Sequence, residues 1–266
     1  MEDEYLGKYI DVFSVKPLKE GFGATTAYIA YALDKNEIDG AIVVKADENW
    51  EPKAIVARNS DDLRASIGTK WVITPMVDAI IDALKVERLE KVAIIGTPCQ
   101  CRVIRDIKEY PMQLGDVINR IKLVIGLFCM GSFTQDGFKT MVERKFGITL
   151  PEIKNAEIRS DKFIIRLING KIIEESLENV KKDVKFACLF CDDFTARSAD
   201  ISFGNAGSES GWRSVIVRDE YAYSLLQSAS RAGYLKMKKL NPEGVNEIIR
   251  LSKEKMERAK RNESLI

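Results

Sequence analysis

The sequence predicts an α/β (α+β) protein that has a mixed sheet with flanking helices and a β-rich C-terminal lobe. Three observations predict this fold. Strand-like and helix-like patterns alternate over residues 1–150, which is typical of a sheet covered by helices. Two mainly apolar runs, Val92–Gly96 and Lys122–Cys129, resemble strands that are buried on both faces. After Pro151, polar and apolar residues alternate, as they do in antiparallel strands with one solvated face.

The first half of the chain supplies most of the predicted sheet. A strand is expected at Tyr9–Val15, and the glycine-rich turn after it opens a helix that runs to Leu33. Strands follow at Gly40–Lys45 and Ala54–Ala57, where aliphatic and β-branched residues dominate. The later elements are a short helix capped at Ser60, a helix at Pro75–Leu84, the strand Val92–Gly96, a helix to Lys108, the strand Lys122–Cys129 and a helix at Thr134–Lys145.

The second half begins with a predicted hairpin. Residues 153–175 alternate in polarity, and Asn169-Gly170, a strong hairpin-turn signal, separates two runs. Short strands are expected at Ile201–Phe203 and Ser214–Val217, and helices are expected from Tyr221 and from Val245. We therefore expect residues 1–150 to form an α/β core and residues 151–266 to form the β-rich lobe.

Composition and charge exclude several classes of function. Among 266 residues, 41 Lys and Arg balance 40 Asp and Glu, so the net charge of +1 gives no electrostatic basis for binding nucleic acid. The absence of histidine from the sequence excludes His-dependent triads and the usual catalytic zinc sites. The apolar runs near the ends are too short to span a bilayer, and Met1–Glu4 is acidic. We therefore expect no signal peptide, no membrane span and a cytoplasmic location.

Five cysteines are the main chemical signal in the sequence, and in the cytoplasm they are expected to be reduced. Cys99 and Cys129 come at or just after predicted core strands, and parallel strands would bring both thiols to one edge of the sheet. Cys188 and Cys191 form a CxxC loop that can offer two more thiols. Four thiolates without histidine fit a [4Fe-4S] cluster or a structural zinc. Cys101, two residues into the helix that follows, is expected to point elsewhere and not to be a ligand.

Three interpretations of the cysteines stay open at this point, and the cluster is favoured. A four-cysteine zinc site is usually built from two CxxC knuckles, whereas this chain has one. Thiols that simply pack in the core are the third interpretation, because buried free cysteines are common.

Two glycine-rich loops are suited to contact a cofactor. Gly21-Phe22-Gly23-Ala24-Thr25-Thr26 precedes a helix, where free backbone N–H groups and two hydroxyls favour phosphate. The loop Gly204–Trp212 combines three glycines, hydroxyl groups and an indole that can stack on a ring. Next to a cluster, the two loops favour a cofactor that carries phosphate and transfers electrons, such as a flavin. A plain helix start and a plain surface hairpin are the alternatives.

Several blocks of this sequence resemble the beta subunit of coenzyme F420-reducing hydrogenase, a family that also handles F420 in formate dehydrogenases and F420H2 dehydrogenases. The order and spacing of these blocks are far more specific than any one glycine motif. They extend from Tyr9 to Lys255 and comprise Gly21–Leu33, Glu37–Ala41, Ile67–Trp71, Gly96–Gln100, Phe128–Met130, Cys188–Cys191, Ala199–Ser202 and Gly204–Trp212.

The resemblance implies FAD, one [4Fe-4S] cluster, and hydride transfer between FAD and the deazaflavin ring of coenzyme F420. It implies a core at residues 1–150 that binds FAD and the cluster, and a lobe at residues 151–266 that completes both sites. The implied cluster ligands are Cys99, Cys129, Cys188 and Cys191. The implied FAD contacts are Gly21, Gly23, Ala24, Thr25, Thr26 and Lys70, with Gly207, Ser208, Gly211 and Trp212 as further candidates.

The expected function is therefore that of an electron-transfer subunit. Electrons from partner subunits, which the resemblance implies are hydrogenase-type large and small subunits, would pass through the cluster to FAD and leave as hydride to F420. The sequence lacks the additional CxxCxxC motifs of some family members, which favours the short hydrogenase-type subunit. The alternatives are a related flavin and iron–sulfur reductase with another substrate, and a non-catalytic zinc-stabilised adaptor. Two departures from the family pattern are Phe22 between its glycines and Gly131-Ser132 after Met130.

Overall fold

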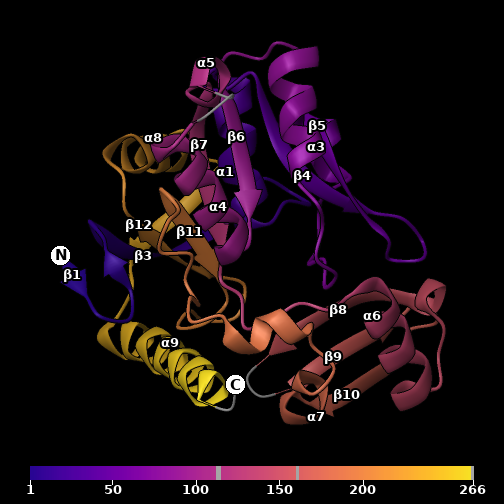
Figure 1. Ribbon diagram of the computed structural model, residues 1–266. Helices are drawn as coiled ribbons and strands as arrows, with labels where there is room; N and C mark the ends of the chain where they lie inside the picture. Colours follow the sequence, from indigo (N-terminus) through magenta and orange to yellow (C-terminus); the bar gives the residue numbers. More distant parts are fainter. Residues whose placement is uncertain (112–114, 160–161, 265–266) are drawn as a thin grey trace.

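A mixed sheet forms the centre of the protein, which is described by a computed structural model over residues 1–111, 115–159 and 162–264 (Figure 1). Within these ranges the sheet has eight strands in the order β13-β3-β12-β11-β7-β6-β4-β5. Their bounds are β3 Asp11–Pro17, β4 Gly40–Ala46, β5 Pro52–Ala57, β6 Val92–Gly96, β7 Ile121–Leu127, β11 Ile201–Gly204, β12 Arg213–Val217 and β13 Leu235–Lys239. The mixed sheet with helices and a further β-rich lobe confirms the predicted fold class.

Most strands of this sheet run in the same direction. β4, β6, β7 and β11 pair in parallel, while β12 is antiparallel to both β11 and β3. Because β12 separates them and opposes both, β3 and β11 also share one direction. The carboxyl ends of β3, β11, β7, β6 and β4 therefore meet one edge of the sheet, where open α/β proteins bind ligands.

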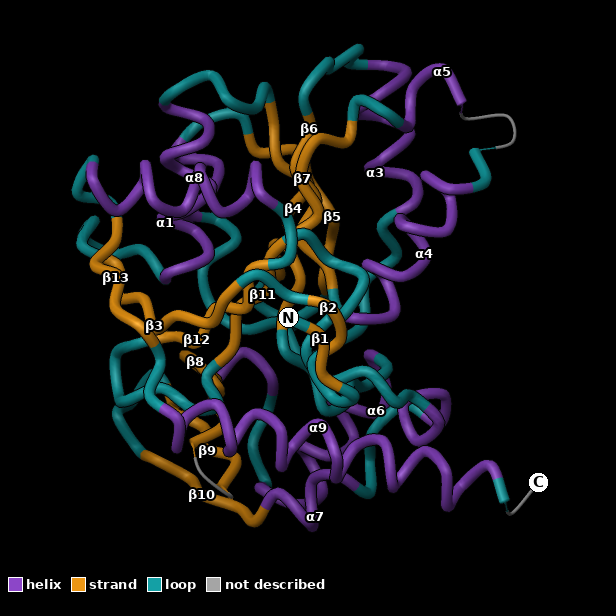
Figure 2. The backbone as a smooth tube through the Cα atoms, turned by 90° about the vertical axis from the view of Figure 1, so that its left-hand side faces the viewer, coloured by secondary structure: helices purple, strands orange, loops and turns teal. Residues whose placement is uncertain are grey.

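Helices cover both faces of the sheet. α1 (Ala24–Asp34) and α8 (Glu220–Arg231) bury apolar residues against one face in a single core cluster. α3 (Val77–Ile81) and α4 (Pro98–Glu109) pack on the other face, and Figure 2 shows the two layers on either side of the strands. Both faces are covered, which explains why β6 and β7 are apolar along nearly their whole length.

A smaller lobe lies below the carboxyl edge of the large sheet (Figure 1). It contains an antiparallel sheet of β8 (Ile153–Arg159), β9 (Lys162–Leu167) and β10 (Ile172–Ser176). Its own apolar cluster also includes α6 (Gln135–Met141) and α7 (Leu177–Lys181). Asn169 and Gly170 form the β9–β10 turn as predicted, although the region holds three strands and not two.

The remaining elements are short, except for the C-terminal helix α9 (Pro242–Glu263), which crosses the end of the molecule nearest the small lobe (Figure 1). They are the ribbon strands β1 Glu2–Asp3 and β2 Gly7–Lys8, the helices α2 Ser60–Arg64 and α5 Gly115–Ile118, π turns at Asp82–Val86 and Val142–Phe146, and 3-10 helices at Leu150–Glu152 and Phe186–Phe190. In the part of the chain that the structure describes, no helix combines the length and apolar character needed to cross a bilayer.

Two further differences from the sequence expectation concern the large sheet. β13, Leu235–Lys239, was not predicted, because its lysines are those of a solvent-exposed edge strand and mask its apolar alternation. β7 ends at Leu127, so Cys129 lies two residues beyond the strand.

The large sheet takes β11, β12 and β13 from the second half of the chain. The division of the chain at residue 150 stays a prediction.

One glycine lets a loop pack tightly against the sheet. A Cβ on Gly126, near the carboxyl end of β7, would lie 2.3 Å from Cβ of Ala196 and 3.0 Å from Cβ of Ala199. The chain that follows the CxxC loop therefore lies directly on β7 and enters β11 beside it.

We expect Gly126→Ala to lower the free energy of unfolding by about 1–3 kcal/mol, because the added methyl group overpacks this contact. Gly115→Ala is the control, since the nearest atom to its Cβ would be Cβ of Pro111 at 3.8 Å. Denaturant unfolding of both variants measures the difference. Equal stability of the two variants would show that the contact at Gly126 relaxes freely.

Candidate functional site

The carboxyl edge of the large sheet gathers the segments that carry the cysteines. Cys99 follows β6 on the first turn of α4, and Cys129 follows β7. The segment Cys188–Cys191 lies between the small lobe and α9 (Figure 1). β6 and β7 are parallel neighbours, which is the condition under which Cys99 and Cys129 emerge at the same edge of the sheet.

The two cysteines of α4 have opposite environments. Oε1 of Gln100 accepts a hydrogen bond from the Thr97 backbone N–H at 2.9 Å, which fixes the start of the helix, and Cys99 is exposed there. Cys101 is buried, with its Sγ 3.6 Å from the carbonyl oxygen of Gly96 and 3.8 Å from that of Ile125. Burial raises the pKa of the Cys101 thiol to about 12, so it is a packed, protonated group. Its role as a non-ligand stays a prediction.

Cys129 lies among groups of both signs. Its backbone N–H donates to the Phe194 carbonyl at 2.9 Å, and its own carbonyl accepts from Nζ of Lys255 at 2.6 Å. Burial raises the pKa of the Cys129 thiol, the Lys255 ammonium opposes that rise, and the neighbouring Cys188 and Cys99 add to it. Cys99 and Cys188 are therefore close enough to Cys129 to interact with it electrostatically.

The CxxC loop is held by polar contacts. Sγ of Cys188 lies 3.8 Å from the Ser132 carbonyl, and Sγ of Cys191 lies 3.7 Å from the Asp193 carbonyl. An ion pair of 3.0 Å between Arg102 and Asp192 joins the loop to α4, the helix that bears Cys99. The loop thus touches both segments that carry the other two thiols.

The donor set fits a cluster chemically, because it consists of thiols with a buried cation beside them and without histidine. Among the residues that the structure describes, no three His, Cys, Asp or Glu side chains lie close enough together to form a closed metal-binding group. The four cysteines share one region, and their assignment as ligands stays a prediction.

One face of α9 contacts both cysteine segments through hydrogen bonds to their backbone. Nζ of Lys255 donates to the Cys129 and Asp193 carbonyls, and Arg258 and Asn262 continue the same face toward the CxxC loop. The sequence does contain a signal for this contact. The buried positions of α9 recur at helical spacing, and one of them is a lysine: Ile248, Ser252, Lys255 and Ala259. A lysine on the buried face of an amphipathic helix calls for polar partners inside the protein.

The predicted phosphate loop leads into a helix whose start is free. Gly23 occupies the N-cap position of α1 and provides no side-chain cap, and the first turn contains no acidic residue. In contrast, Gln100, Asp219 and Asn241 satisfy backbone N–H groups at the starts of α4, α8 and α9. The N–H groups of α1 are therefore available to an anion.

Basic side chains surround the same loop. The ring of Phe22 is buried in the core, with the guanidinium carbon of Arg64 4.9 Å and Nζ of Lys19 5.3 Å from its centroid. A Cβ on Gly21, which has φ of +76°, would lie 3.2 Å from a guanidinium nitrogen of Arg64. The Phe22 side chain thus points into the core and leaves the glycines on the surface. Ala24 is buried, so only its backbone faces the loop, while Thr25 and Thr26 are half-buried.

Lys70 lies in the loop after α2, and α2 packs against α1. Its Nζ donates to the carbonyls of Ser66, Ile67 and Gly68 at 3.2, 2.9 and 3.0 Å. Burial lowers the pKa of Lys70 to about 8. Its predicted contact with FAD is not tested by these hydrogen bonds and stays a prediction.

The second glycine loop, between β11 and β12, is fixed from within. Oγ of Ser208 lies 2.8 Å from the hydroxyls of Ser14 and Ser214. A Cβ on Gly207 would lie 2.3 Å from the Gly244 carbonyl oxygen, so the loop and the start of α9 touch backbone to backbone. Nζ of Lys238 lies 4.6 Å from the ring centroid of Trp212. Gly207 and Ser208 thus have structural roles, and their predicted contacts with FAD, like those of Gly211 and Trp212, stay predictions.

Comparison with protein families gives two matches that together cover most of the chain. Both models describe the beta subunit of coenzyme F420 hydrogenase/dehydrogenase. Residues 17–81 match the model of its N-terminal part, and residues 89–243 match the model of its C-terminal part.

Individual relatives agree with these matches. The coenzyme F420 hydrogenase subunit beta of Methanothermobacter thermautotrophicus is 31% identical over 97% of this chain and 95% of its own length. The coenzyme F420-dependent sulfite reductase of Methanocaldococcus jannaschii is 34% identical over 74% of this chain and 33% of its own length. A solved chain of the F420-reducing [NiFe] hydrogenase complex from Methanosarcina barkeri superposes with a TM-score of 0.93 at 30% identity, covering 98% of this chain and 94% of the other.

The contact between Gly207 and α9 can be tested with a matched pair of variants. Gly207 and Gly211 both have positive φ, of +83° and +81°, so alanine costs similar backbone strain at each. Only at Gly207 would the new Cβ meet another backbone, because nothing lies within 4 Å of it at Gly211. We expect Gly207→Ala to reduce hydrogen-exchange protection of α9 and Gly211→Ala to preserve it. Equal protection in both variants would contradict the close contact.

Proposed function

This chain belongs to the coenzyme F420 hydrogenase/dehydrogenase beta-subunit family, and we propose that it is an iron–sulfur flavoprotein subunit. In this proposal it transfers hydride between FAD and coenzyme F420, and a [4Fe-4S] cluster passes electrons from a hydrogenase-type partner. The observation that carries the proposal is the gathering of four cysteines from three segments at one edge of the sheet.

Cys99, Cys129, Cys188 and Cys191 are the residues that would hold the cluster. They come from the start of α4, the chain after β7 and the CxxC loop. A site with four cysteine ligands therefore requires all three segments to be brought together by the fold. The fixed segments around them supply thiolates, the ligands that iron–sulfur clusters take.

The start of α1 is the region that would bind the FAD pyrophosphate. Its uncapped N–H groups and the positive end of the helix dipole favour an anion, and Arg64 and Lys19 add positive charge. Gly23 has φ of −81° and an open Cβ direction, with Oγ1 of Thr26 at 3.9 Å as the nearest atom. A phosphate can therefore approach this backbone closely.

The two cofactors supply the electron chemistry when bound: FAD exchanges hydride with C5 of the F420 deazaflavin, and the cluster exchanges single electrons with a partner. In this proposal the chain binds and orients the two cofactors and excludes water from them. These roles do not require histidine, which the sequence lacks. In this proposal Lys70 places a cation beside the flavin pyrimidine ring, and Trp212 offers a ring for stacking. The role of Lys70 requires Nζ to exchange one of its three carbonyl partners for the cofactor.

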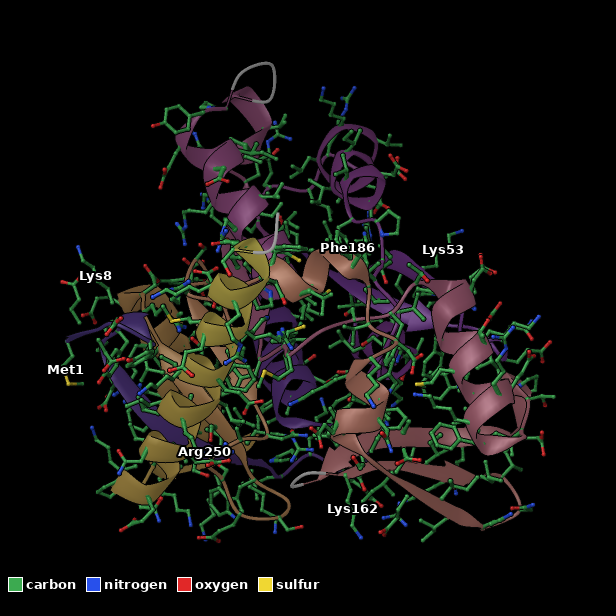
Figure 3. The ribbon with its side chains drawn as sticks, turned by 60° about the horizontal axis from the view of Figure 1, so that its bottom comes forward. Met1, Lys8, Lys53, Lys162, Phe186 and Arg250 are labelled. Atoms are coloured by element: carbon green, nitrogen blue, oxygen red, sulfur yellow. The ribbon has the colours of Figure 1, made fainter. Side chains whose placement is uncertain are left out.

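A partner would approach beside the CxxC loop. The side chain of Phe186 is 70% exposed, its ring lies 5.1 Å from that of Phe190, and Figure 3 shows it at the surface near the C-terminal end of α9. Electron transfer needs the next redox centre close to the cluster, and an exposed aromatic side chain such as Phe186 is typical of a protein contact. The superposed Methanosarcina barkeri chain comes from a hydrogenase complex, which supports hydrogenase-type large and small subunits as partners.

Replacement of any of the four proposed ligands by alanine should remove the cluster or leave it defective. Cys101→Ala is the control and should retain full iron content, because that thiol is buried with its Sγ near core carbonyls. Iron analysis and the visible spectrum of anaerobically purified protein measure the effect. Loss of iron in Cys101→Ala with retention of iron in Cys99→Ala would reverse the ligand assignment. A colourless wild-type protein with bound zinc would instead indicate the non-catalytic, zinc-stabilised adaptor.

Gly23→Val should abolish FAD binding and leave iron unchanged. The branched side chain has room in the protein alone, since Gly23 is neither strained nor crowded, so lost flavin would reflect lost phosphate access. Flavin content and dye reduction by reduced F420 are the measurements, with Cys101→Ala as a flavin-loaded comparison. Normal flavin occupancy in Gly23→Val would exclude this loop. A wild type that binds both cofactors and fails to react with F420 would indicate a reductase for another substrate.

A further inference from the structure

The C-terminal helix α9 holds the backbone of both cysteine segments from one face. Lys255, Arg258 and Asn262 lie on successive turns of this helix. Their side chains donate hydrogen bonds to backbone carbonyl groups in and beside the two cysteine segments. The acceptors are the carbonyls of Cys129 (2.6 Å) and Asp193 (2.7 Å) for Lys255, Met130 (2.9 Å) and Cys188 (3.0 Å) for Arg258, and Leu189 (2.9 Å) for Asn262. The face therefore joins two segments that lie almost sixty residues apart in the sequence.

Apolar burial does not explain how the CxxC loop is fixed. The 3-10 helix Phe186–Phe190 contains no buried residue, although burial of apolar area is what usually fixes a segment in place. Its position depends instead on hydrogen bonds from charged donors, which are about twice as strong as neutral ones. From α9, Arg258 supplies one such bond to the Cys188 carbonyl and Asn262 adds a neutral one to the Leu189 carbonyl, while the ion pair between Arg102 and Asp192 holds the opposite side.

Lys255 is also a buried cation without a carboxylate. The residue is 1% exposed, and among the described residues no Asp or Glu lies within ion-pair distance of its Nζ. Burial of an unpaired ammonium is costly, and two carbonyl groups compensate only part of its charge. Negative charge on Cys129 would add to the compensation, because Nζ of Lys255 is bonded to the carbonyl of that residue and interacts electrostatically with its thiol.

We propose that Lys255, Arg258 and Asn262 form a clamp that positions Cys129, Cys188 and Cys191 for the cluster, and that the Lys255 ammonium offsets the negative charge of the cluster thiolates. The part that concerns charge rests on the proposed function, because four thiolates outweigh the positive charge of the iron–sulfur core. The part that concerns position holds for the protein without any cofactor. These three are positioning residues, since they contact the backbone of the cysteine segments.

The positional part can be measured in protein without iron. In a full-length background with Cys99, Cys101 and Cys191 changed to serine, the remaining Cys129 and Cys188 are bridged by dibromobimane, which fluoresces when it joins two thiols. Lys255→Met should slow bridging about tenfold, which corresponds to the loss of a hydrogen bond from a charged donor. Lys253→Met is the matched control, because Lys253 lies on the exposed side of the same helix and its side chain is 56% exposed.

Thermal melting of each variant separates a lost clamp from a lost fold. If Lys255→Met does not fold, Asn262→Leu is used, which removes a single hydrogen bond near the exposed end of the helix. It should slow bridging between Cys129 and a retained Cys191 while the melting temperature stays close to that of the parent. Unchanged bridging in folded Lys255→Met, or in Asn262→Leu when that variant is needed, would overturn the clamp.

The part that concerns charge is tested with iron-loaded protein by redox titration monitored by electron paramagnetic resonance. Lys255→Met should shift the cluster midpoint potential to more negative values or lose iron, whereas Lys253→Met should do neither, because a nearby buried cation favours the added electron. An unshifted potential with full iron in Lys255→Met would overturn the role of its charge. If the wild type itself binds no iron, the proposed function fails, and the bridging rates alone decide the clamp.

Discussion

The parallel pairing of β6, β7 and β11 is the constraint on which the remaining structure depends. It brings the chain out three times at one edge, so that Cys99, Cys129 and the loop after Gly204 emerge beside one another. The segment that leads into β11 also packs closely on β7, because Gly126 leaves room for Ala196 and Ala199. The small lobe and α9 then close the same edge from below (Figure 1).

The two proposed cofactor regions differ in how open they are. The start of α1 is open: its N–H groups lack a side-chain cap, and the glycines beside it are exposed. The cysteine region is closed by hydrogen bonds from α9 and by a buried cation. An open helix start suits a ligand that arrives from solution with its own charge, whereas a braced set of thiols suits a group that must be held at fixed geometry.

The sequence predicted what depends on local pattern and missed what depends on contacts between distant segments. Buried strands such as Val92–Gly96 could be recognised because they are apolar and short, and the different directions of Cys99 and Cys101 followed from their spacing on a helix. β13 could not be recognised, because its pairing with β3 is fixed by tertiary contact and its composition is that of an exposed segment. The partners of Lys255 are two carbonyls far away in the chain, which no periodicity can indicate.

The position of α9 after every cysteine in the chain has a consequence for biosynthesis. Because a chain leaves the ribosome from its N-terminal end, Cys99, Cys129, Cys188 and Cys191 are all exposed before the residues of α9 have been made. During that interval Lys255 and Arg258 do not yet hold the cysteine segments together, and the thiols are open to oxidation and to adventitious metal ions. The contacts that fix the cysteine segments can therefore form only after α9 has been translated.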